Sequence, residues 1–259
     1  MKICFTTALF GDPRKLDKPA KFERIPEHDY FLFTDINEEH FDTSWDIINI
    51  KDNSNISNLT SNVRKSRYPK FMSWELLESL GKSYDVVFYC DAQFSPRSDF
   101  DWVECAEIVL KPELNEFGFM QTYHWIDRVR NGGINGDIRQ ILRGGRDTRE
   151  SMNKTRQFFK MHDESVDLNK NVYYENTTFG YSMNDDVVRN LLSEFWKIYT
   201  SEDITFRDQP LWNFLLIKHN LTPSVCNQIA KKNDKGDVNW GGAFTLSGEK
   251  AKRFRVGSF

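Results

Sequence analysis

The residues of this chain that could do chemistry are polar side chains at the ends of apolar, strand-like runs. Asp91 follows the run 86–90, and Thr6, Thr7 and Asp35 lie at the ends of two earlier runs. Ligands of open α/β sheets bind beyond the carboxyl ends of strands, so these positions are candidates for a binding site. A carboxylate such as Asp91 could hold a divalent cation against a diphosphate. The alternative is a turn residue, because Asp often ends strands.

A basic cluster of Arg64, Lys65, Arg67 and Lys70 lies just before and inside the expected start of a helix. Free N–H groups and the helix dipole favour anions at such a position, so the cluster suits a diphosphate. A solvated basic face is the competing interpretation.

Two carboxylates further along the chain are candidates for acid–base chemistry. Asp208, in the segment 206–210, is well placed to cap a helix, and capping alone would explain it. Glu175 lies inside the apolar run 172–181, where a carboxylate usually needs a partner or a purpose.

Composition and missing motifs exclude several classes of protein. No Gly-x-Gly-x-x-Gly follows the first strand, and the sequence has no Walker loop, no Cys/His metal spacing and no Gly-x-Ser-x-Gly. These absences disfavour a dehydrogenase, a Rossmann methyltransferase and a P-loop enzyme. With 35 basic and 38 acidic residues the formal net charge is −3, which gives no footprint for nucleic acid or an anionic membrane.

The cysteines and the hydropathy pattern predict a cytoplasmic protein. Cys4, Cys90, Cys105 and Cys226 are widely separated, and we expect reduced core residues rather than disulfides. No apolar run approaches the ~20 residues that span a bilayer, and the N-terminus lacks a signal-peptide pattern. We therefore expect no membrane span and no nucleic-acid partner.

Strand-like segments alternate with helix-like segments, which predicts an α/β fold with a mainly parallel central sheet flanked by helices. Strands are expected at 2–10, 29–35, 45–50, 86–90, 117–123 and 172–181. Helices are expected at 69–80 with Pro69 in the first position, 101–110, 147–162, from 184–186 to 199, and 208–219. A mobile loop with a short helix is expected at 131–146. We expect one domain, divided into a nucleotide-sugar-binding half (1–110), an acceptor half (111–231) and a loop-rich tail (232–259).

Several motifs in order resemble those of GT-A glycosyltransferases. The motifs are Thr6-Thr7-Ala8-Leu9-Phe10-Gly11, Phe33-Thr34-Asp35, the basic residues of 64–70, Tyr89-Cys90-Asp91-Ala92 and Arg207-Asp208-Gln209. The chain is similar to the group long catalogued as a domain of unknown function in plant and bacterial polysaccharide glycosyltransferases. It resembles glycogenin-like galactosyltransferases more loosely, and viral capsid-glycosylating enzymes look similar.

The resemblance implies which residues bind the donor. Thr6, Thr7, Ala8 and Asp35 would hold the nucleoside. A basic residue of the next helix would contact the donor, and the candidates for it are Arg64, Arg67 and Lys70.

The resemblance also implies a divalent cation, Mn²⁺ or Mg²⁺, bound at an Asp-x-Asp motif. This chain has Asp91-Ala92-Gln93, so Asp91 carries over while Gln93 offers only a carbonyl oxygen.

The resemblance places Asp208 and Gln209 against the donor sugar or the acceptor. His124 and Arg128 partly match a further motif at altered spacing. An inverting enzyme would also need a carboxylate as base, and Asp208 or Glu175 is the candidate.

The expected function is transfer of a sugar from a UDP- or GDP-linked donor to a hydroxyl of a glycan or glycoprotein acceptor. One alternative is a sugar-1-phosphate nucleotidyltransferase, although its Gly-rich basic loop after the first strand is missing. The other is a non-catalytic glycan-binding or nucleotide-sugar-binding module, in which Trp125, Trp212 and Trp240 would stack on sugars.

Overall fold

A computed structural model gives the architecture of the chain. It describes residues 1–16, 18–19, 21–112, 116–124, 126–170, 172–225, 231–232, 238–239 and 243–246. Within these residues, seven strands form a central sheet in the order β3-β2-β1-β4-β7-β6-β8. Strands β1, β2, β3 and β4 are parallel, whereas β7 runs antiparallel to both of its neighbours and β8 is parallel to β6. The predicted α/β class with a mainly parallel sheet is therefore correct at this level.

The strands follow the apolar runs of the sequence. The central strands are β1 (Ile3–Leu9), β2 (Asp29–Thr34), β3 (Asp46–Asn49), β4 (Val86–Cys90), β6 (Glu116–Tyr123), β7 (Tyr174–Ser182) and β8 (Thr222–Val225). Short strands outside the central sheet are β5 (Phe94–Pro96), β9 (Lys231–Lys232), β10 (Val238–Asn239) and β11 (Phe244–Leu246). Strand β4 is buried along its whole length, as expected for a central parallel strand. Strand β3 lies at the sheet edge and is partly exposed, and β8 is a strand that the sequence analysis missed.

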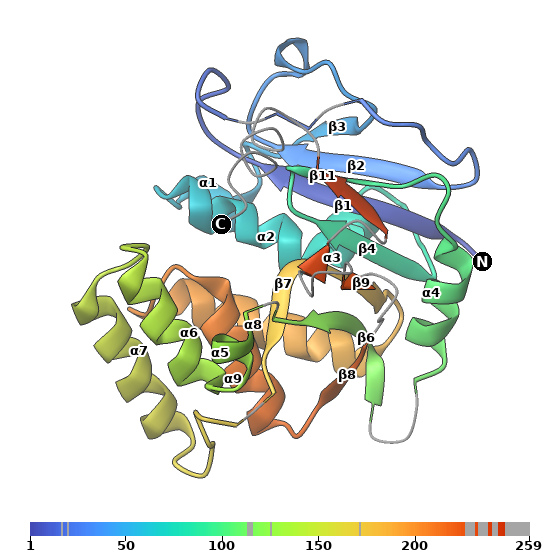
Figure 1. Cartoon of the computed structure of the whole chain (residues 1–259). Coiled ribbons are helices and arrows are strands. Elements are labelled where there is room, and N and C mark those ends of the chain that lie inside the picture. Colours follow the sequence, from blue (N-terminus) through green and yellow to red (C-terminus); the bar gives the residue numbers. More distant parts are fainter. Residues whose placement is uncertain are drawn as a thin grey trace.

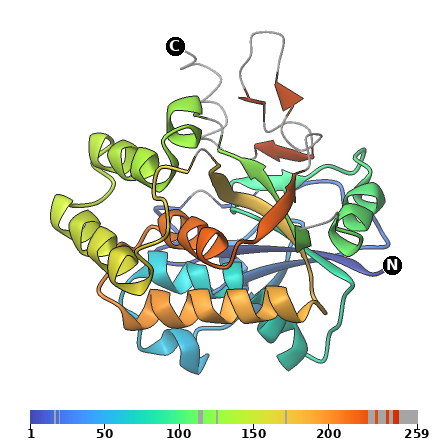
Figure 2. The ribbon, with the colours of Figure 1, turned by 90° about the horizontal axis from the view of Figure 1, so that it is seen from below.

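Helices occupy both faces of the sheet. They are η1 (Glu38–His40), α1 (Ser54–Ser57), α2 (Asn62–Phe71), α3 (Ser73–Ser79), α4 (Trp102–Leu110), α5 (Asp127–Arg130), α6 (Gly133–Arg143), α7 (Arg149–His162), α8 (Asp186–Ser201) and α9 (Asp208–Lys218). In Figures 1 and 2, α2, α3 and α8 lie along one face, and α4 lies on the other. Helices α5, α6 and α7 stand together beside the half of the sheet that contains β7 and β6 (Figure 1).

The two faces of the sheet bury two apolar clusters. Phe33, Val87 and Phe179 pack on the side of α2, α3, α8 and α9. Phe5 and Phe88 pack on the other side, beside Trp102 of α4. Because side chains alternate along a strand, β1, β2, β4 and β6 each contribute to both clusters. This burial fixes the sheet and therefore the position of the residues that follow each strand.

The helix expected at 69–80 differs from the observed structure. Helix α2 begins at Asn62, where the Ser61 hydroxyl accepts a hydrogen bond from Arg64 N at 3.4 Å, and it contains Pro69 in its last turn. The chain breaks at Met72 before α3. Proline is common at the first position of a helix, and that preference misled the prediction, because Pro69 lies near the end of α2 and only two residues of the helix follow it. The basic cluster therefore extends along α2: Arg64 and Lys65 lie near its N-terminus, whereas Arg67 lies mid-helix and Lys70 near its end.

The segment 131–146 also differs from its prediction. It contains the whole of α6, an 11-residue helix, so the helix expected in this segment is longer than predicted and takes the place of most of the mobile loop. Gly133 begins α6 with φ 56, and a Cβ there would lie 2.6 Å from Lys170 O. Glycine is thus needed for a positive φ and a close approach of backbone, rather than for mobility.

Three further expectations concern cysteines, membrane spans and the tail. Cys4, Cys90 and Cys105 are buried free thiols, and Cys226 lies outside the described residues. Among the described helices, none is long and apolar enough to cross a bilayer. Most of the predicted tail 232–259 also lies outside the described residues, as do Trp125 and Trp240.

Candidate functional site

Helix α2 connects acidic residues that follow two of the parallel strands. The Lys65 ammonium lies 3.8 Å from Asp35 Oδ2, and the Lys70 ammonium lies 3.2 Å from Asp91 Oδ1. Asp35 follows β2 and Asp91 follows β4. The carboxyl ends of parallel strands meet at one edge of a sheet, so α2 runs along the edge where ligands of such sheets bind.

Lys70 lies between two carboxylates that are distant in sequence. Its Nζ is 3.2 Å from Asp91 Oδ1 and 3.1 Å from Asp208 Oδ2, and its side chain is 3% exposed. The Tyr89 hydroxyl donates to the same Asp91 oxygen at 3.0 Å. The ammonium also lies over the Tyr89 ring, 5.1 Å from its centroid. The two ion pairs offset the loss of hydration of this buried side chain.

Asp208 is held by a second cation from α2. Arg67 Nε lies 3.1 Å from Asp208 Oδ1, and Asn176 Nδ2 donates to Oδ2 at 3.3 Å. Burial by itself would raise the pKa of the Asp208 carboxyl, but the charges of Arg67 and Lys70 outweigh burial and bring the pKa below its ordinary range. Asp208 therefore stays ionised and is a poor proton acceptor near neutral pH.

The prediction that Asp208 caps α9 is wrong. Arg207 is the N-cap residue, and Asp208 is the first residue of the helix. The Asp208 side chain reaches Arg67 and Lys70 in place of the free N–H groups of its own helix. The acidic side chain still benefits from the helix dipole in this first turn.

An irregularity in the pairing of β6 with β7 lies at Glu175, Asn176 and Thr177, three polar residues that line the same pocket. The pairing of β6 with β7 shifts between Gln121 and Thr122, so that Gln121 pairs with Phe179 while Thr122 pairs with Glu175. Residues 176–178 are left out of this ladder, as in a β-bulge. Gln121 Nε2 stabilises the irregular backbone by donating to Asn176 Oδ1 at 2.8 Å and to Glu175 O at 3.0 Å.

These elements surround one polar pocket of about 240 Å³. Its lining comes from α2, the ends of β4 and β6, the irregular part of β7, helix α6 and the start of α9. The lining residues are Arg67, Lys70, Asp91, His124, Ile126, Asp137, Gln140, Arg146, Glu175, Asn176, Thr177, Arg207, Asp208 and Gln209. The structure thus brings together seven predicted site residues: Arg67, Lys70, Asp91, His124, Glu175, Asp208 and Gln209.

Asp137 and His124, which also line the pocket, have displaced pKa values as well. Burial raises the pKa of Asp137 to about 6, although the Tyr173 hydroxyl opposes this by donating to Asp137 Oδ2 at 2.7 Å. Burial lowers the pKa of His124 to about 4, so this imidazole is neutral at pH 7. Displaced values in a cleft are typical of functional sites.

Glu175 stands at the edge of this pocket, 7% exposed. Its Oε1 accepts a hydrogen bond from Thr177 Oγ1 at 2.7 Å. The carboxylate that sequence reasoning singled out within a strand is therefore placed beside Lys70 and Asp208 in the same pocket.

The predicted nucleoside residues do not line this pocket. Ala8 lines a second hollow of about 510 Å³ between the end of β1 and the start of α2. Asp35 shapes that hollow by accepting a hydrogen bond from Gly11 N at 3.1 Å. Thr6 and Thr7 are 0% exposed within β1 and line no described pocket, so a ligand would not reach their hydroxyls in this conformation.

Other predicted residues lie apart from the pocket. Arg64 donates to Tyr199 O at 2.6 Å and to Ile204 O at 3.0 Å, so it joins α2 to the end of α8. Gln93 lies half-buried in the turn after Asp91. Arg128 is exposed on α5 and reaches the pocket only through Gln140, to which it donates at 2.6 Å.

Sequence reasoning missed Asp137, Arg146 and Arg207. Arg146 fell in the expected loop, and Asp137 is in α6, which the sequence analysis did not predict in full. Arg207 adjoins Asp208 in the matched motif, and this adjacency was the signal that could have identified it. None of the acidic side chains in the described part of the chain forms an ion pair with Arg146 or Arg207.

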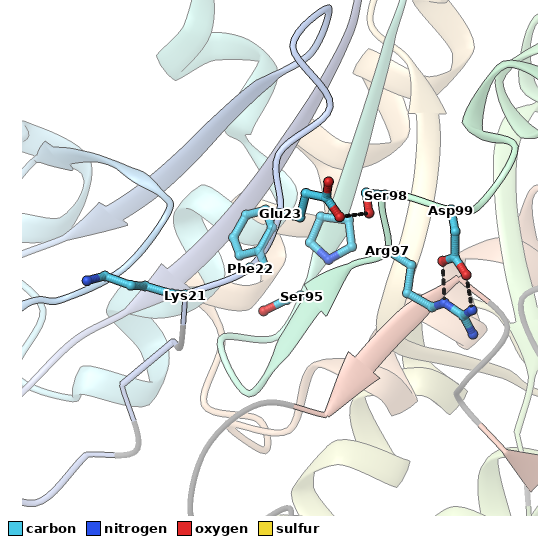
Figure 3. Close-up of a pocket in the computed structure, with 8 residues that line it drawn as sticks. Lys21, Phe22, Glu23, Ser95, Arg97, Ser98 and Asp99 are labelled. Carbon is cyan, nitrogen blue, oxygen red and sulfur yellow. Dashed lines mark hydrogen bonds and ion pairs between the residues drawn. The ribbon is translucent and has the colours of Figure 1, made fainter.

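A third hollow, of about 430 Å³, lies between residues 21–23 and the segment 95–99. Figure 3 shows two pairs of facing side chains in it: the Ser98 hydroxyl donates to Glu23 at 2.8 Å, and Arg97 pairs with Asp99, whereas Lys21 points away from them. Because these groups satisfy each other near the surface, this hollow is a weaker candidate than the pocket around Lys70.

The pocket does not bring the expected metal donors, Asp91 and Gln93, together. Asp91 Oδ1 already accepts from Lys70 and Tyr89, and a cation bridging Asp91 and Asp208 would meet the Lys70 ammonium between them. Gln93 does not line the pocket.

Comparison with known proteins adds no family assignment. No protein-family model matches the chain, and no curated protein sequence matches it.

Proposed function

We propose that the chain is a glycosyltransferase of the GT-A type, which moves a sugar from a nucleoside diphosphate to a hydroxyl of a glycan acceptor. One observation carries the proposal. Four basic side chains from three parts of the chain, Arg67, Lys70, Arg146 and Arg207, line one pocket beyond the end of β4. Such a pocket suits a diphosphate, since cationic donors form the strongest hydrogen bonds to phosphate oxygens.

Arg146 and Arg207 are the side chains most able to contact the diphosphate. Arg67 and Lys70 already pair with Asp208, whereas Arg146 and Arg207 pair with no acid in the described structure. Arg207 immediately precedes α9, where the helix dipole also favours an anion. The hollow beside Ala8 and Gly11 is then the place for the nucleoside, with Asp35 shaping its wall.

The transfer step places charge on the leaving diphosphate. The anomeric carbon–oxygen bond breaks, and its electron pair goes to the terminal phosphate oxygen. The acceptor oxygen bonds to the anomeric carbon, and in an inverting reaction its proton passes to a carboxylate. Fixed cations at the diphosphate stabilise the charge that develops.

Glu175 and Asp137 suit the role of base better than Asp208. Asp208 is bound by two cations, and the lowered pKa makes it a weak proton acceptor. The pKa of Asp137, about 6, is close to that of an effective base at neutral pH. Asp208 instead positions Arg67 and Lys70.

A non-catalytic nucleotide-sugar-binding module of the same fold is the second candidate. The observation that favours it is the mutual pairing of Lys70, Asp91 and Asp208, which leaves fewer free charged groups for a reaction. Turnover separates the two functions, because a binding module shows no release of nucleoside diphosphate when donor and acceptor are present. For either function we propose a cytoplasmic location, which the free thiols of Cys4, Cys90 and Cys105 support.

A thermal-shift screen tests the proposal. The full chain is melted with UDP, GDP, their sugar conjugates and, as a control, inorganic sulfate, each with and without Mn²⁺. A ligand at 100 times its Kd stabilises a protein by ~2.7 kcal/mol, and we expect this for at least one nucleoside diphosphate or its sugar. If sulfate gives the same shift as every nucleotide, the pocket is only an anion site and the proposal fails.

A further inference from the structure

We propose that Arg67 and Lys70 supply the positive charge that a divalent cation supplies in enzymes with an intact Asp-x-Asp motif, so this chain binds its donor without a metal ion. The inference rests on the proposed function and specifies its electrostatics. It goes against the expectation of Mn²⁺ or Mg²⁺, and the disagreement comes from the geometry around Lys70.

The charge balance of the pocket supports this substitution. Arg67 and Lys70 carry two positive charges and are paired with two carboxylates, Asp91 and Asp208. One divalent cation between the same carboxylates would give the same net charge. The two side chains therefore replace the cation without leaving a buried charge uncompensated.

The ammonium position also opposes a bound cation. Lys70 Nζ lies 3.2 Å from Asp91 and 3.1 Å from Asp208, so an ion that bridged both carboxylates would lie within a few ångströms of it. Repulsion between like charges at such distances is substantial in a poorly solvated site. A metal ion would have to displace the lysine side chain, which is 3% exposed.

The fold holds Lys70 in place. Tyr68, Pro69 and Phe71, its neighbours on α2, are buried, and the Phe71 ring packs 4.0 Å from that of Phe195, measured between centroids. The ammonium lies over the Tyr89 ring and near the C-terminal end of α2, two positions that favour a cation. Lys70 is thus preorganised before any ligand arrives.

The test compares nucleoside diphosphate binding in two media. The Kd values of UDP and GDP for the full chain are measured by calorimetry, once in excess EDTA and once in Mn²⁺. We expect the Kd of the bound nucleotide to differ by less than about twofold between the media, because the required charge is built in. Binding that appears only with Mn²⁺ overturns the inference and leaves the proposed function intact. If neither nucleotide binds in either medium, the proposed function itself fails.

A pair of variants tests the role of Lys70 directly. Lys70→Met removes the buried ammonium, and Lys154→Met removes an exposed one that also lies between two carboxylates, Glu150 and Asp203. In EDTA we expect Lys70→Met to weaken nucleotide binding at least about tenfold, and Lys154→Met to leave the Kd unchanged. Wild-type affinity of a folded Lys70→Met variant in EDTA overturns the inference. If that variant does not fold, the comparison of EDTA with Mn²⁺ on the wild-type chain decides alone.

Discussion

The Lys70 ammonium lies 3.1 Å from Oδ2 of Asp208, and Arg67 approaches the other oxygen of the same carboxylate at 3.1 Å. Two successive turns of α2 thus form ion pairs with the first residue of α9. Because α9 also contributes Gln209 and follows Arg207, this ion-pair cluster sets the position of one wall of the pocket.

We predict that Asp208→Asn destabilises the protein, in contrast to an ordinary cap substitution. Without the negative charge of Asp208, the buried guanidinium of Arg67 loses its ion-pair partner. Breaking a buried ion pair in this way lowers the free energy of unfolding by about 3 kcal/mol or more. Asp101→Asn is the matched control, because Asp101 accepts from Glu104 N at the start of α4 and Asn caps as well as Asp. Urea denaturation of both variants checks this. Equal, small losses would mean that the cluster contributes little.

We predict that Asp91→Asn keeps a cooperative melt but turns over at least ~10²-fold more slowly. The side chain is 36% exposed, and an amide oxygen can still accept from Lys70 and Tyr89, so folding loses little. The lost negative charge leaves Lys70 with Asp208 alone and alters its position. Nucleoside diphosphate release is measured with the true acceptor. An unchanged rate in EDTA and in Mn²⁺ would reduce Asp91 to a turn residue.

The pKa of Asp137 predicts a specific dependence of stability on pH. The pKa of the Asp137 carboxyl in the folded protein, about 6, lies above its ordinary value. The proton bound by Asp137 therefore contributes to stability at pH values below that ordinary pKa, and this contribution is lost as the pH rises through about 6. Asp137→Asn removes the ionisation. Between pH 4 and pH 7 we expect the free energy of unfolding of the variant to rise by on the order of 3 kcal/mol relative to that of the wild type.

A second variant controls the Asp137 experiment. Tyr173→Phe removes the hydroxyl that donates to Asp137 at 2.7 Å and lowers its pKa, so the loss of stability should move to higher pH. Both series are measured by denaturation at several pH values. A difference between wild type and Asp137→Asn that does not change with pH would contradict the raised pKa.

We predict that Arg64→Met lowers stability without changing nucleotide affinity. The guanidinium donates to Tyr199 O and Ile204 O at the end of α8, and hydrogen bonds to a charged group contribute about 1.5–3 kcal/mol each. Calorimetry with UDP and GDP gives the Kd, and thermal melting gives the stability. A clear rise in the nucleotide Kd with an unchanged melting temperature would contradict this prediction and support the role in donor binding that the resemblance implies for Arg64.

The sequence by itself predicted six of the seven described strands of the central sheet and most helices, because their signals are local. The run 86–90 became β4 with the same bounds, and the segments expected to be helical at 101–110 and 147–162 became α4 and α7. Strand periodicity, turn residues and caps lie within a few residues of each other, so the chain reveals them directly. The rule that ligands bind beyond the carboxyl ends of strands then made Asp91 one of the candidate site residues.

Only the tertiary structure decided which side chains meet. Lys70, Asp91 and Asp208 belong to α2, the end of β4 and the start of α9, and no local pattern shows that they share one cluster. The start of α2 at Asn62 left Arg67 and Lys70 away from the helix N-terminus, and packing against the sheet then turned Lys70 inward. The pKa values of buried groups depend on the same long-range packing, since desolvation and ion pairs come from residues far apart in the chain.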